Sequence, residues 1–223
     1  MNHKIVIAID GPSASGKSTV ARKVADVLGY VHVDSGALYR GITWSILSAG
    51  INPAKKVALI SHIDSCAFQF TNRDHSMRFT INGFDPWESL RSDTVRENVS
   101  TIAAVPEIRE RVVKWLRQMT SFGNLAMEGR DIASVVFPDT PFKFYIDADP
   151  AERARRRCKE LAASEKTDEE SVRNSLESRD RKDSGRDTAP LKVANGATVI
   201  DSTHMTIDQV VALIVARISP ERH

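Results

Sequence analysis

The sequence predicts an α/β protein with three layers, in which helices cover a five-stranded, mainly parallel sheet. Residues 4–10 form a short apolar run that leads directly into a glycine-containing loop and a helical pattern ending at Gly29. A second strand and helix follow at once, and this alternation is typical of parallel sheets. Three more apolar runs end in polar residues. The expected strands therefore cover 4–10, 30–34, 124–128, 142–147 and 197–201.

Further helices are expected where apolar residues recur every three or four positions. They cover residues 37–49, 53–66, 90–104, 106–119, 150–163 and 206–219. One more helix is expected between residue 167 and about residue 178. A polar break at 164–167 separates two of them. Residues 67–81 differ, because two alternating runs flank a polar turn and so predict a β-hairpin. We expect this hairpin to belong to an inserted subdomain, at about 60–95, that closes over a ligand.

The composition is that of an ordinary globular protein. Its 223 residues, of which 41% are hydrophobic, suffice for one core with insertions. A formal net charge of +2 is too small to argue for nucleic acid as a partner. No apolar run approaches the ~20 residues of a membrane span, and no signal-peptide region precedes the first strand, so we expect a cytoplasmic protein. Cys66 and Cys158 lack metal-like spacing and are expected to be free thiols.

The loop after the first strand has the residue pattern of a phosphate-binding site. In Gly11-x-x-x-x-Gly16-Lys17-Ser18 the glycines let backbone N–H groups converge on phosphate oxygens, and the Lys17 ammonium reaches the terminal phosphates. The Ser18 hydroxyl is suited to hold Mg²⁺, and the following helix adds its positive N-terminal end. A Gly/Ser-rich turn without a ligand is the alternative. The candidate nucleotide-binding residues are Gly11, Pro12, Ser13, Ala14, Ser15, Gly16, Lys17, Ser18 and Thr19.

Polar residues also follow the other expected strands. Ligands of parallel sheets bind beyond the carboxyl ends of the strands, so Asp34, Ser35 and Arg40 are expected to face the same crevice as the phosphate loop. Gly129-Arg130-Asp131 ends the third strand in the same way. The charge cluster at 179–186 is either a solvated surface or part of this site, and its patterning leaves both interpretations open.

Five stretches of the chain form a recognisable combination. They are Ile9 to Thr19, Asp34-Ser35-Gly36-Ala37-Leu38-Tyr39-Arg40, Gly129-Arg130-Asp131-Ile132, Val135-Val136-Phe137-Pro138-Asp139 and Arg179-Asp180-x-x-Asp183-x-x-Arg186. The phosphate loop alone indicates only a large superfamily, but the later motifs together are highly specific. Over nearly its full length the chain resembles the bacterial cytidylate kinase family, in the nucleoside monophosphate kinase group.

The resemblance implies a P-loop kinase fold, with the nucleotide-binding insert at about 60–95 and a helical lid at about 150–167. It implies transfer of the γ-phosphoryl group of ATP to CMP or dCMP with Mg²⁺, in pyrimidine nucleotide metabolism. A monomer without nucleic-acid or membrane partners is expected. Phosphoryl transfer requires many arginines and no nucleophilic side chain, because the protein mainly positions two polyanions and neutralises their charge.

The resemblance also implies roles for individual residues. The acceptor phosphate would be held by Arg40, Arg130 and Arg186, the cytosine by Ser35, Arg109 and Asp131, and the sugar by Ser100, Arg179 and Asp183. The expected catalytic residues are Lys17, Arg130, Arg186 and a lid arginine, Arg157. For Asp131 the alternative is a structural ion pair with Arg130.

Two departures from the family pattern concern the same region. Ala133-Ser134 stands where Gly-Thr is expected, and Glu128 stands where an Asp is expected. The sequence leaves open which carboxylate completes the Mg²⁺ site. Asp34 and Asp10 are the candidates, and either could instead accept hydrogen bonds from loop amides.

Other function classes fit the sequence less well. A GTP-dependent switch would need a guanine-reading Asn-Lys-x-Asp stretch, which the sequence lacks. An ATPase bound to nucleic acid would need a broad basic surface. A kinase for another nucleoside monophosphate or for shikimate is the nearest alternative, and incubation with each acceptor would distinguish them.

Overall fold

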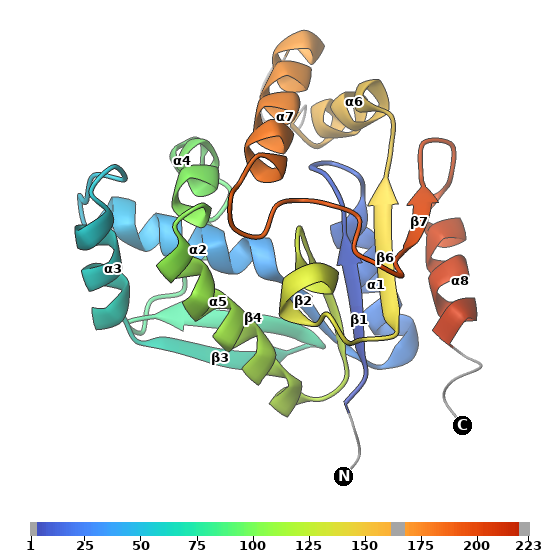
Figure 1. Ribbon diagram of the computed structural model, residues 1–223, viewed down its shortest axis with the longest axis horizontal. Helices are drawn as coiled ribbons and strands as arrows, with labels where there is room; N and C mark the ends of the chain where they lie inside the picture. The colour runs from blue at the N-terminus through green and yellow to red at the C-terminus, as the bar shows by residue number, and fades with distance from the viewer. Residues whose placement is uncertain (1–3, 162–167, 219–223) are drawn as a thin grey trace.

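The computed structural model describes residues 4–161 and 168–218, which fold around one seven-stranded sheet. The strands are β1 (Val6–Asp10), β2 (Val31–Asp34), β3 (Phe68–Arg73), β4 (Ser76–Ile81), β5 (Leu125–Gly129), β6 (Phe142–Asp147) and β7 (Thr198–Asp201). Their order across the sheet is β3-β4-β2-β5-β1-β6-β7. All neighbouring strands are parallel except those of the β3–β4 hairpin. The expected α/β fold with a mainly parallel sheet is confirmed (Figure 1).

Each expected helix is present. They are α1 (Lys17–Leu28), α2 (Ser35–Ser48), α3 (Lys56–Ser65), α4 (Asp93–Ala103), α5 (Pro106–Gln118), α6 (Pro150–Leu161), α7 (Glu169–Ser184) and α8 (Ile207–Ile218), with the short turns η1 (Met119–Phe122) and η2 (Ile132–Val136). The expectation that a helix ends near residue 178 is wrong, because α7 continues to Ser184 and includes most of the charge cluster. The expected polar break at 164–167 lies outside the described residues.

The strand count differs from the five expected. All five expected strands are present, and the hairpin supplies two more in the same sheet. The junction is narrow, since β4 joins β2 through the pairing of His32 with Ser76, and the His32 amide donates to the His75 carbonyl oxygen at 2.8 Å. On its other side the hairpin packs two phenylalanine rings, Phe68 and Phe70, against Trp115 of α5. Alternating patterns predict strands but do not specify which neighbour each strand joins.

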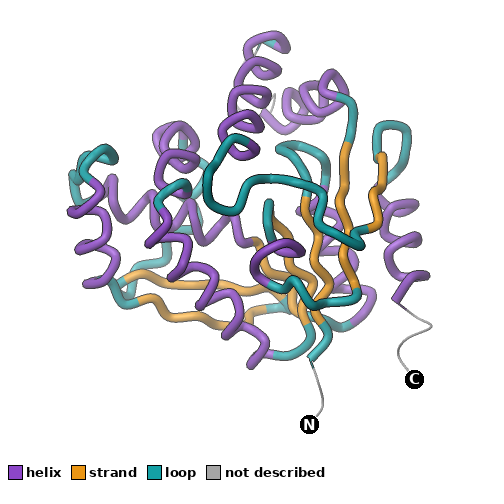
Figure 2. The backbone as a smooth tube through the Cα atoms, viewed as in Figure 1, coloured by secondary structure: helices purple, strands orange, loops and turns teal. Residues whose placement is uncertain are grey.

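Different helices cover the two faces of the sheet (Figure 2). Side chains alternate along β1, so Ile7 and Ile9 pack against α1 and α8. Val6 and Ala8 face the other way, toward a core built with α2, α4 and α5. The three-layer prediction is therefore confirmed. A third, smaller apolar cluster joins α6 and α7, and Ala14 of the phosphate loop packs against it.

The carboxyl ends of the central strands define one edge of the molecule. The arrowheads of β1 and β6 point toward α6 and α7 (Figure 1). From α7 the chain runs across this region to β7 (Figure 2). Cys66 and Cys158 are free, as expected. Within residues 4–161 and 168–218 no helix is both long and apolar enough to cross a membrane.

Candidate active site

The phosphate loop joins the end of β1 to the start of α1, so the expected strand–loop–helix order is present. Ala14 and Gly16 have φ values of 60° and 87°, which turn the backbone sharply toward the helix. At Gly11 a Cβ atom would lie 2.1 Å from the carbonyl oxygen of Ile146 in β6, so a larger residue cannot fit. Because α1 begins at Lys17, its unpaired N-terminal amides belong to the same loop.

Lys17 is buried, with 5% of the residue exposed. Its Nζ donates to the carbonyl oxygen of Pro12 at 2.8 Å. Burial, together with the nearby Arg130 guanidinium, lowers the pKa of Lys17 to about 7, against the opposing effect of Glu128. A polyphosphate beside this amine would raise its pKa again, because an anion stabilises the protonated form.

The carboxylate in contact with Ser18 is Glu128. Ser18 Oγ donates to Glu128 Oε1 at 2.6 Å. Glu128 stands near the end of β5, where the parallel register sets it beside Ile9 of β1, and burial raises its pKa to about 7. Hydroxyl and carboxylate oxygens are suitable Mg²⁺ ligands. Glu128 is not among the sequence-predicted site residues, although its place near a strand end beside the phosphate loop could have identified it.

Both carboxylates expected from the sequence as Mg²⁺ ligands have other partners in this structure. Asp10 accepts hydrogen bonds from the amides of Ile132 and Ala133 at 2.9 and 2.8 Å, and burial raises its pKa to about 6. Asp34 caps the N-terminus of α2 and pairs with Arg40 Nη2 at 2.7 Å. Although burial acts in the opposite direction, the Arg40 charge holds the pKa of Asp34 at about 2. Asp10 therefore binds backbone amides, as in the structural alternative, whereas Asp34 binds an amide of helix α2 and the Arg40 side chain.

Arg130 connects the phosphate loop with α7. Its Nη2 donates to Ser13 Oγ at 2.7 Å, and its Nε donates to Asp183 Oδ2 at 3.0 Å. Arg186 Nη1 lies 3.9 Å from the other carboxylate oxygen of Asp183. The structure therefore brings together residues that lie more than 100 positions apart in sequence. The charge cluster is not a fully solvated surface, because Asp183 is buried.

Four arginines expected at the acceptor site have unused hydrogen-bond donors. The Nε atoms of Arg40, Arg109, Arg179 and Arg186 are buried and have no hydrogen-bond partner in the part of the chain that the structure describes. Burial, with the charge of Arg130, lowers the pKa of Arg179 to about 10. Buried N–H groups and cations of this kind are stabilised by an anion.

Arg109 and Asp131, both expected to read the base, form an ion pair between α5 and the segment after β5. Their side chains are 3% and 6% exposed, and Arg109 Nη1 also donates to the carbonyl oxygen of Ala103 at 3.0 Å. The alternative pairing of Asp131 with Arg130 is absent, since Arg130 binds Asp183. Among the described residues, Arg109 is the residue that forms an ion pair with Asp131.

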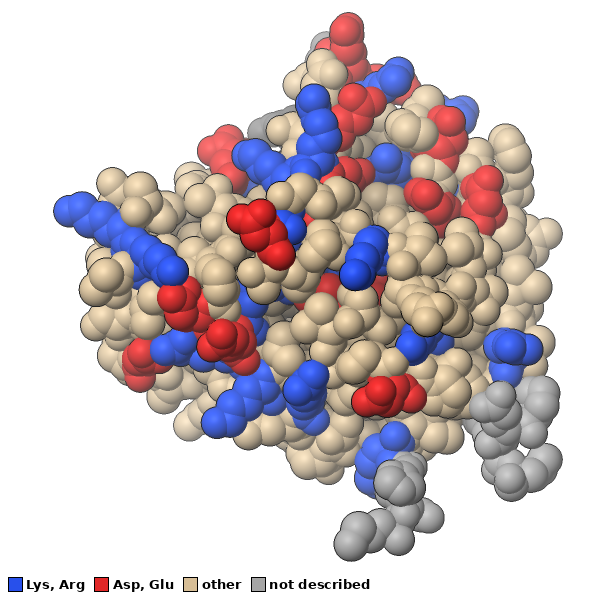
Figure 3. Space-filling view, viewed as in Figure 1, with Lys and Arg blue, Asp and Glu red and all other residues tan. Residues whose placement is uncertain are grey.

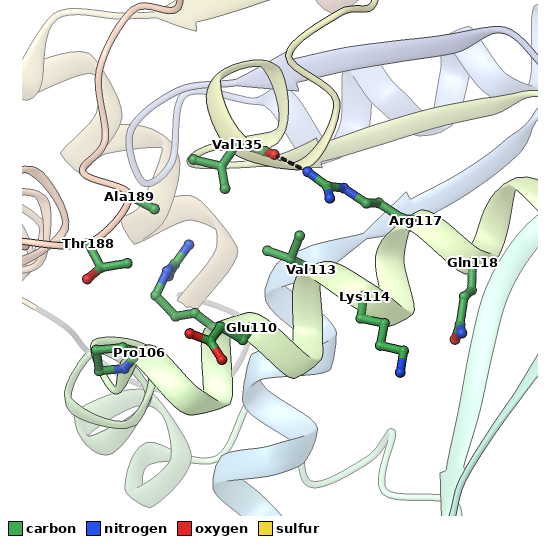
Figure 4. A pocket seen from close by; sticks show the side chains of 10 residues that line it. Pro106, Glu110, Val113, Lys114, Arg117, Gln118, Val135, Thr188 and Ala189 are labelled. Atoms are coloured by element: carbon green, nitrogen blue, oxygen red, sulfur yellow. Dashed lines mark hydrogen bonds between the residues drawn. The ribbon is translucent and has the colours of Figure 1, made fainter.

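A cavity of about 580 Å³ opens beside this ion pair (Figure 4). One side of α5 lines it, with Val135, Thr188 and Ala189 opposite. Arg109 takes part in the lining. Arg117 fixes the far wall, because its guanidinium donates to two carbonyl oxygens of η2 at 2.8 and 2.9 Å. Arg109 is thus the member of the ion pair that contributes to the cavity wall, although its side chain is only 3% exposed.

Ser35 and Ser100 complete the residues expected at the acceptor. Ser35 Oγ donates to the carbonyl oxygen of Glu128 at 2.7 Å, so the start of α2 is bound to the end of β5. Ser100 lies in α4, which contacts both α2 and α7. Ser35 is thus bound to the β5 residue whose side chain contacts Ser18, whereas Ser100 is on a neighbouring helix.

Arg157 does not contact the phosphate loop. Its Nη1 pairs with Glu160 of the same helix at 2.8 Å. Two other arginines of α6 take the position next to the loop: Arg153 and Arg156 donate to loop carbonyl oxygens at 3.1 and 3.4 Å. The sequence predicted an arginine-rich helix near the phosphates but not which of its faces meets them.

Comparison with known proteins identifies the family. The family model described as cytidylate kinase matches residues 7–220. The cytidylate kinase of Pelotomaculum thermopropionicum is 41% identical over 225 residues, covering 100% of this chain and 99% of that protein. The cytidylate kinase of Limosilactobacillus reuteri is 42% identical over 212 residues, covering 93% and 92%. The crystal structure of an uncharacterised protein from Eubacterium ventriosum has a TM-score of 0.51 at 12% identity, covers 97% of this chain and 99% of its own, and indicates the fold alone.

These relationships cover the whole of the region that contains the loop, the arginines and the ion pair described above. The expectation drawn from the sequence motifs is confirmed at the level of family and reaction. The chain belongs to the cytidylate kinase family and transfers the γ-phosphoryl group of ATP to CMP or dCMP.

Proposed function

We propose that the phosphate loop binds the donor ATP while the arginines beside it bind CMP. Residues 11–19 hold the donor phosphates through those backbone N–H groups that have no other partner, with Lys17 at the terminal phosphates. Pro12 has no N–H group, and the Ser13 amide donates to Asp180. The α-phosphate of CMP is held by Arg40, Arg130 and Arg186, the cytosine by Ser35, Arg109 and Asp131, and the sugar by Ser100, Arg179 and Asp183.

The observation that most directly supports this proposal is the group of unpaired guanidinium donors. Arg40, Arg179 and Arg186 each keep a buried Nε without a hydrogen-bond partner within the described residues. Leaving a buried donor unpaired costs about 1–3 kcal/mol, and more for a charged group. A nucleotide phosphate provides both acceptor oxygens and opposite charge, in a shape that the guanidinium fork matches.

Arginines and one lysine are sufficient for the chemistry. Phosphoryl transfer passes through a loose transition state whose charge spreads over three oxygens, so a protein accelerates it by alignment and charge stabilisation. Lys17 and Arg130 lie close enough for the charge of Arg130 to lower the pKa of Lys17. A phosphoryl group between them would be stabilised from both sides, and most strongly as its charge redistributes.

We propose that Mg²⁺ binds through Ser18 with Glu128 as its carboxylate. The 2.6 Å contact between Ser18 Oγ and Glu128 Oε1 brings two oxygen ligands together at the loop. Burial favours the neutral form of Glu128, and a divalent cation would favour its ionised form. When bound, the metal neutralises donor phosphate charge. Within the described residues no cluster of three or more His, Cys, Asp or Glu side chains offers another metal site.

We also propose that two segments close over the bound nucleotides: the insert at about 60–95 and the lid at about 150–167, of which residues 150–161 are described. The single pairing between β2 and β4 supports movement of the hairpin as a unit. Arg157 is proposed to reach the transferring group after closure. Its ion pair with Glu160 is partly exposed and therefore weak.

The remaining proposals concern the setting in which the enzyme acts. We propose that it works as a monomer in the cytoplasm, on free nucleotides and without nucleic acid. On the face shown in Figure 3, basic and acidic side chains of the described residues are interspersed, whereas a protein bound to nucleic acid would need a broad basic surface.

The assignment of the acceptor arginines is tested by Arg186→Gln. Losing a charge-assisted bond of about 1.5–3 kcal/mol should raise KM for CMP by roughly 10- to 150-fold and leave KM for ATP within about threefold. Arg173→Gln is the matched control, because Arg173 is exposed on the same helix and its ion pair among the described residues is with Glu177. An Arg186→Gln variant with an unchanged KM for CMP would contradict the assignment.

A further inference from the structure

Asp180 belongs to the motif shared with the family but has no role in the assignments above. It lies in α7, between the arginine and aspartate proposed to contact the sugar. Its Oδ1 accepts a hydrogen bond from the backbone amide of Ser13 at 3.1 Å. Its Oδ2 forms an ion pair with Arg153 of α6, and the side chains are 16% and 9% exposed. A mostly buried carboxylate of α7 is thus bound directly to the phosphate loop.

Ser13 is held by three different elements. Besides the bond from its amide to Asp180, its carbonyl oxygen accepts from Arg153 Nη1 at 3.1 Å. Its hydroxyl oxygen accepts from Arg130 Nη2 at 2.7 Å. The amide, carbonyl and hydroxyl of one loop residue therefore bind α7, α6 and the end of β5. Any displacement of α7 must change the position of Ser13 or break these bonds.

The same helix also reaches the proposed acceptor site. Asp183 follows Asp180 by one helical turn, and it binds Arg130 Nε at 3.0 Å. Arg186 Nη1 lies 3.9 Å from Asp183. Asp180 therefore binds the phosphate loop, and Asp183, one turn later, contacts the arginines assigned to CMP. Arg130 closes the network, because it contacts both Asp183 and Ser13.

We propose that Asp180 is a positioning residue that couples the two substrate sites. CMP, by binding Arg130 and Arg186, fixes the position of α7, and Asp180 then holds Ser13 and the phosphate loop in the conformation that binds ATP. Coupling of this kind is reciprocal, so ATP tightens CMP binding by the same factor. The inference rests on the proposed assignment of the acceptor residues. The alternative is that Asp180 only neutralises Arg153.

The test is the affinity for CMP, measured by calorimetry with and without a non-hydrolysable ATP analogue and Mg²⁺. The parent protein should bind CMP at least about fivefold more tightly with the analogue, the lower end of measured couplings. Asp180→Asn keeps the size of the side chain but cannot accept from both Ser13 and Arg153, because its amide nitrogen only donates. For this variant we expect the ATP analogue to change the affinity for CMP by no more than about twofold.

Two further variants make the outcome decisive. Glu177→Gln changes a partly exposed glutamate one turn earlier in α7, which pairs with Arg173, and should keep the parent's ratio of CMP affinities with and without the analogue. Asp180→Glu retains a negative charge beside Arg153 but moves the oxygen away from the Ser13 amide, so it separates the two roles even if Asp180→Asn folds poorly. A reduced ratio in Asp180→Glu supports coupling, and a parental ratio overturns it. A parent that binds both nucleotides without coupling also overturns the inference, whereas a parent that fails to bind CMP contradicts the proposed function.

Discussion

Replacing Asp131 with asparagine should change the base preference while preserving the shape of the site. One carboxylate oxygen of Asp131 accepts from Arg109 Nη2. Because a guanidinium only donates, the asparagine must turn its carbonyl oxygen toward Arg109, which directs its NH₂ group to the position of the second carboxylate oxygen. We propose that this position faces C4 of the base. Cytosine carries an amino donor there, and uracil carries a carbonyl acceptor, so the substitution mismatches CMP and matches UMP.

The size of the effect follows from the burial of the pair. Its side chains are only 3% and 6% exposed, so water cannot replace the lost bond. A charge-assisted hydrogen bond of about 1.5–3 kcal/mol corresponds to a loss of roughly 10- to 150-fold in kcat/KM for CMP. The value for UMP should stay within about threefold or rise. Removing the charge opposite the buried Arg109 also lowers stability, and we expect Tm to fall by a few degrees up to about 10 °C.

The assay measures ADP release with CMP and with UMP, together with the melting temperature of each variant. Asp64→Asn is the matched control, because it makes the same substitution in a more exposed ion pair between α3 and α5, Asp64 with Arg111. The control should retain both kcat/KM values. Equal losses on CMP and UMP in Asp131→Asn would refute base reading by Asp131 and leave it a structural partner of Arg109.

Three other outcomes are expected. Lys17→Ala should lose at least about 100-fold in kcat with little change in Tm, since the ammonium acts most strongly in the transition state; turnover within about threefold of the parent would contradict its role. Glu128→Gln should raise the Mg²⁺ concentration for half-maximal activity by roughly tenfold, and an unchanged Mg²⁺ titration would remove Glu128 from the metal site. Burial lowers the pKa of His32 to about 4, whereas the unfolded value is near 6.5, so the unfolded chain binds more protons between these values. Stability should therefore fall as pH drops from 6.5 toward 4.5, and urea titrations at both pH values should show that His32→Gln loses about 2–3 kcal/mol of this dependence. An identical dependence in that variant would show that His32 has the same pKa in the folded and unfolded chains, and would contradict the effect of burial.

Local signals in the sequence were sufficient to predict the phosphate loop and the positions of the strands. Gly11, Gly16 and Lys17 lie within a few residues of one another, so a motif defines their geometry, and the structure has the expected strand, loop and helix. The strand-end rule correctly placed Arg130 at the loop, where it donates to Ser13, because parallel strands end at one edge of the sheet. Ser35 binds the end of β5 at the same edge.

Partners that come from distant parts of the chain were not predictable. Asp10 and Glu128 are both carboxylates at strand ends, and only the fold determines that backbone amides of η2 donate to Asp10 while Ser18 donates to Glu128. Asp34 differs, because its partner Arg40 lies only six positions away. The length of α7 has a similar cause. Its charged C-terminal turns are stabilised by Arg130 and Arg153 from other elements, which no periodicity in the segment itself reveals.

The central claim is that the phosphate loop and the arginines beside it form a site for transfer from ATP to CMP. Its most direct test is to incubate the protein with ATP and Mg²⁺ and with CMP, UMP, AMP, GMP or shikimate in turn, and to measure ADP together with the phosphorylated acceptor. We predict the highest kcat/KM for CMP, at least about 100-fold above UMP, because Arg109 and Asp131 would leave polar groups unpaired against uracil. Equal or faster transfer to any of the other four acceptors would contradict the account.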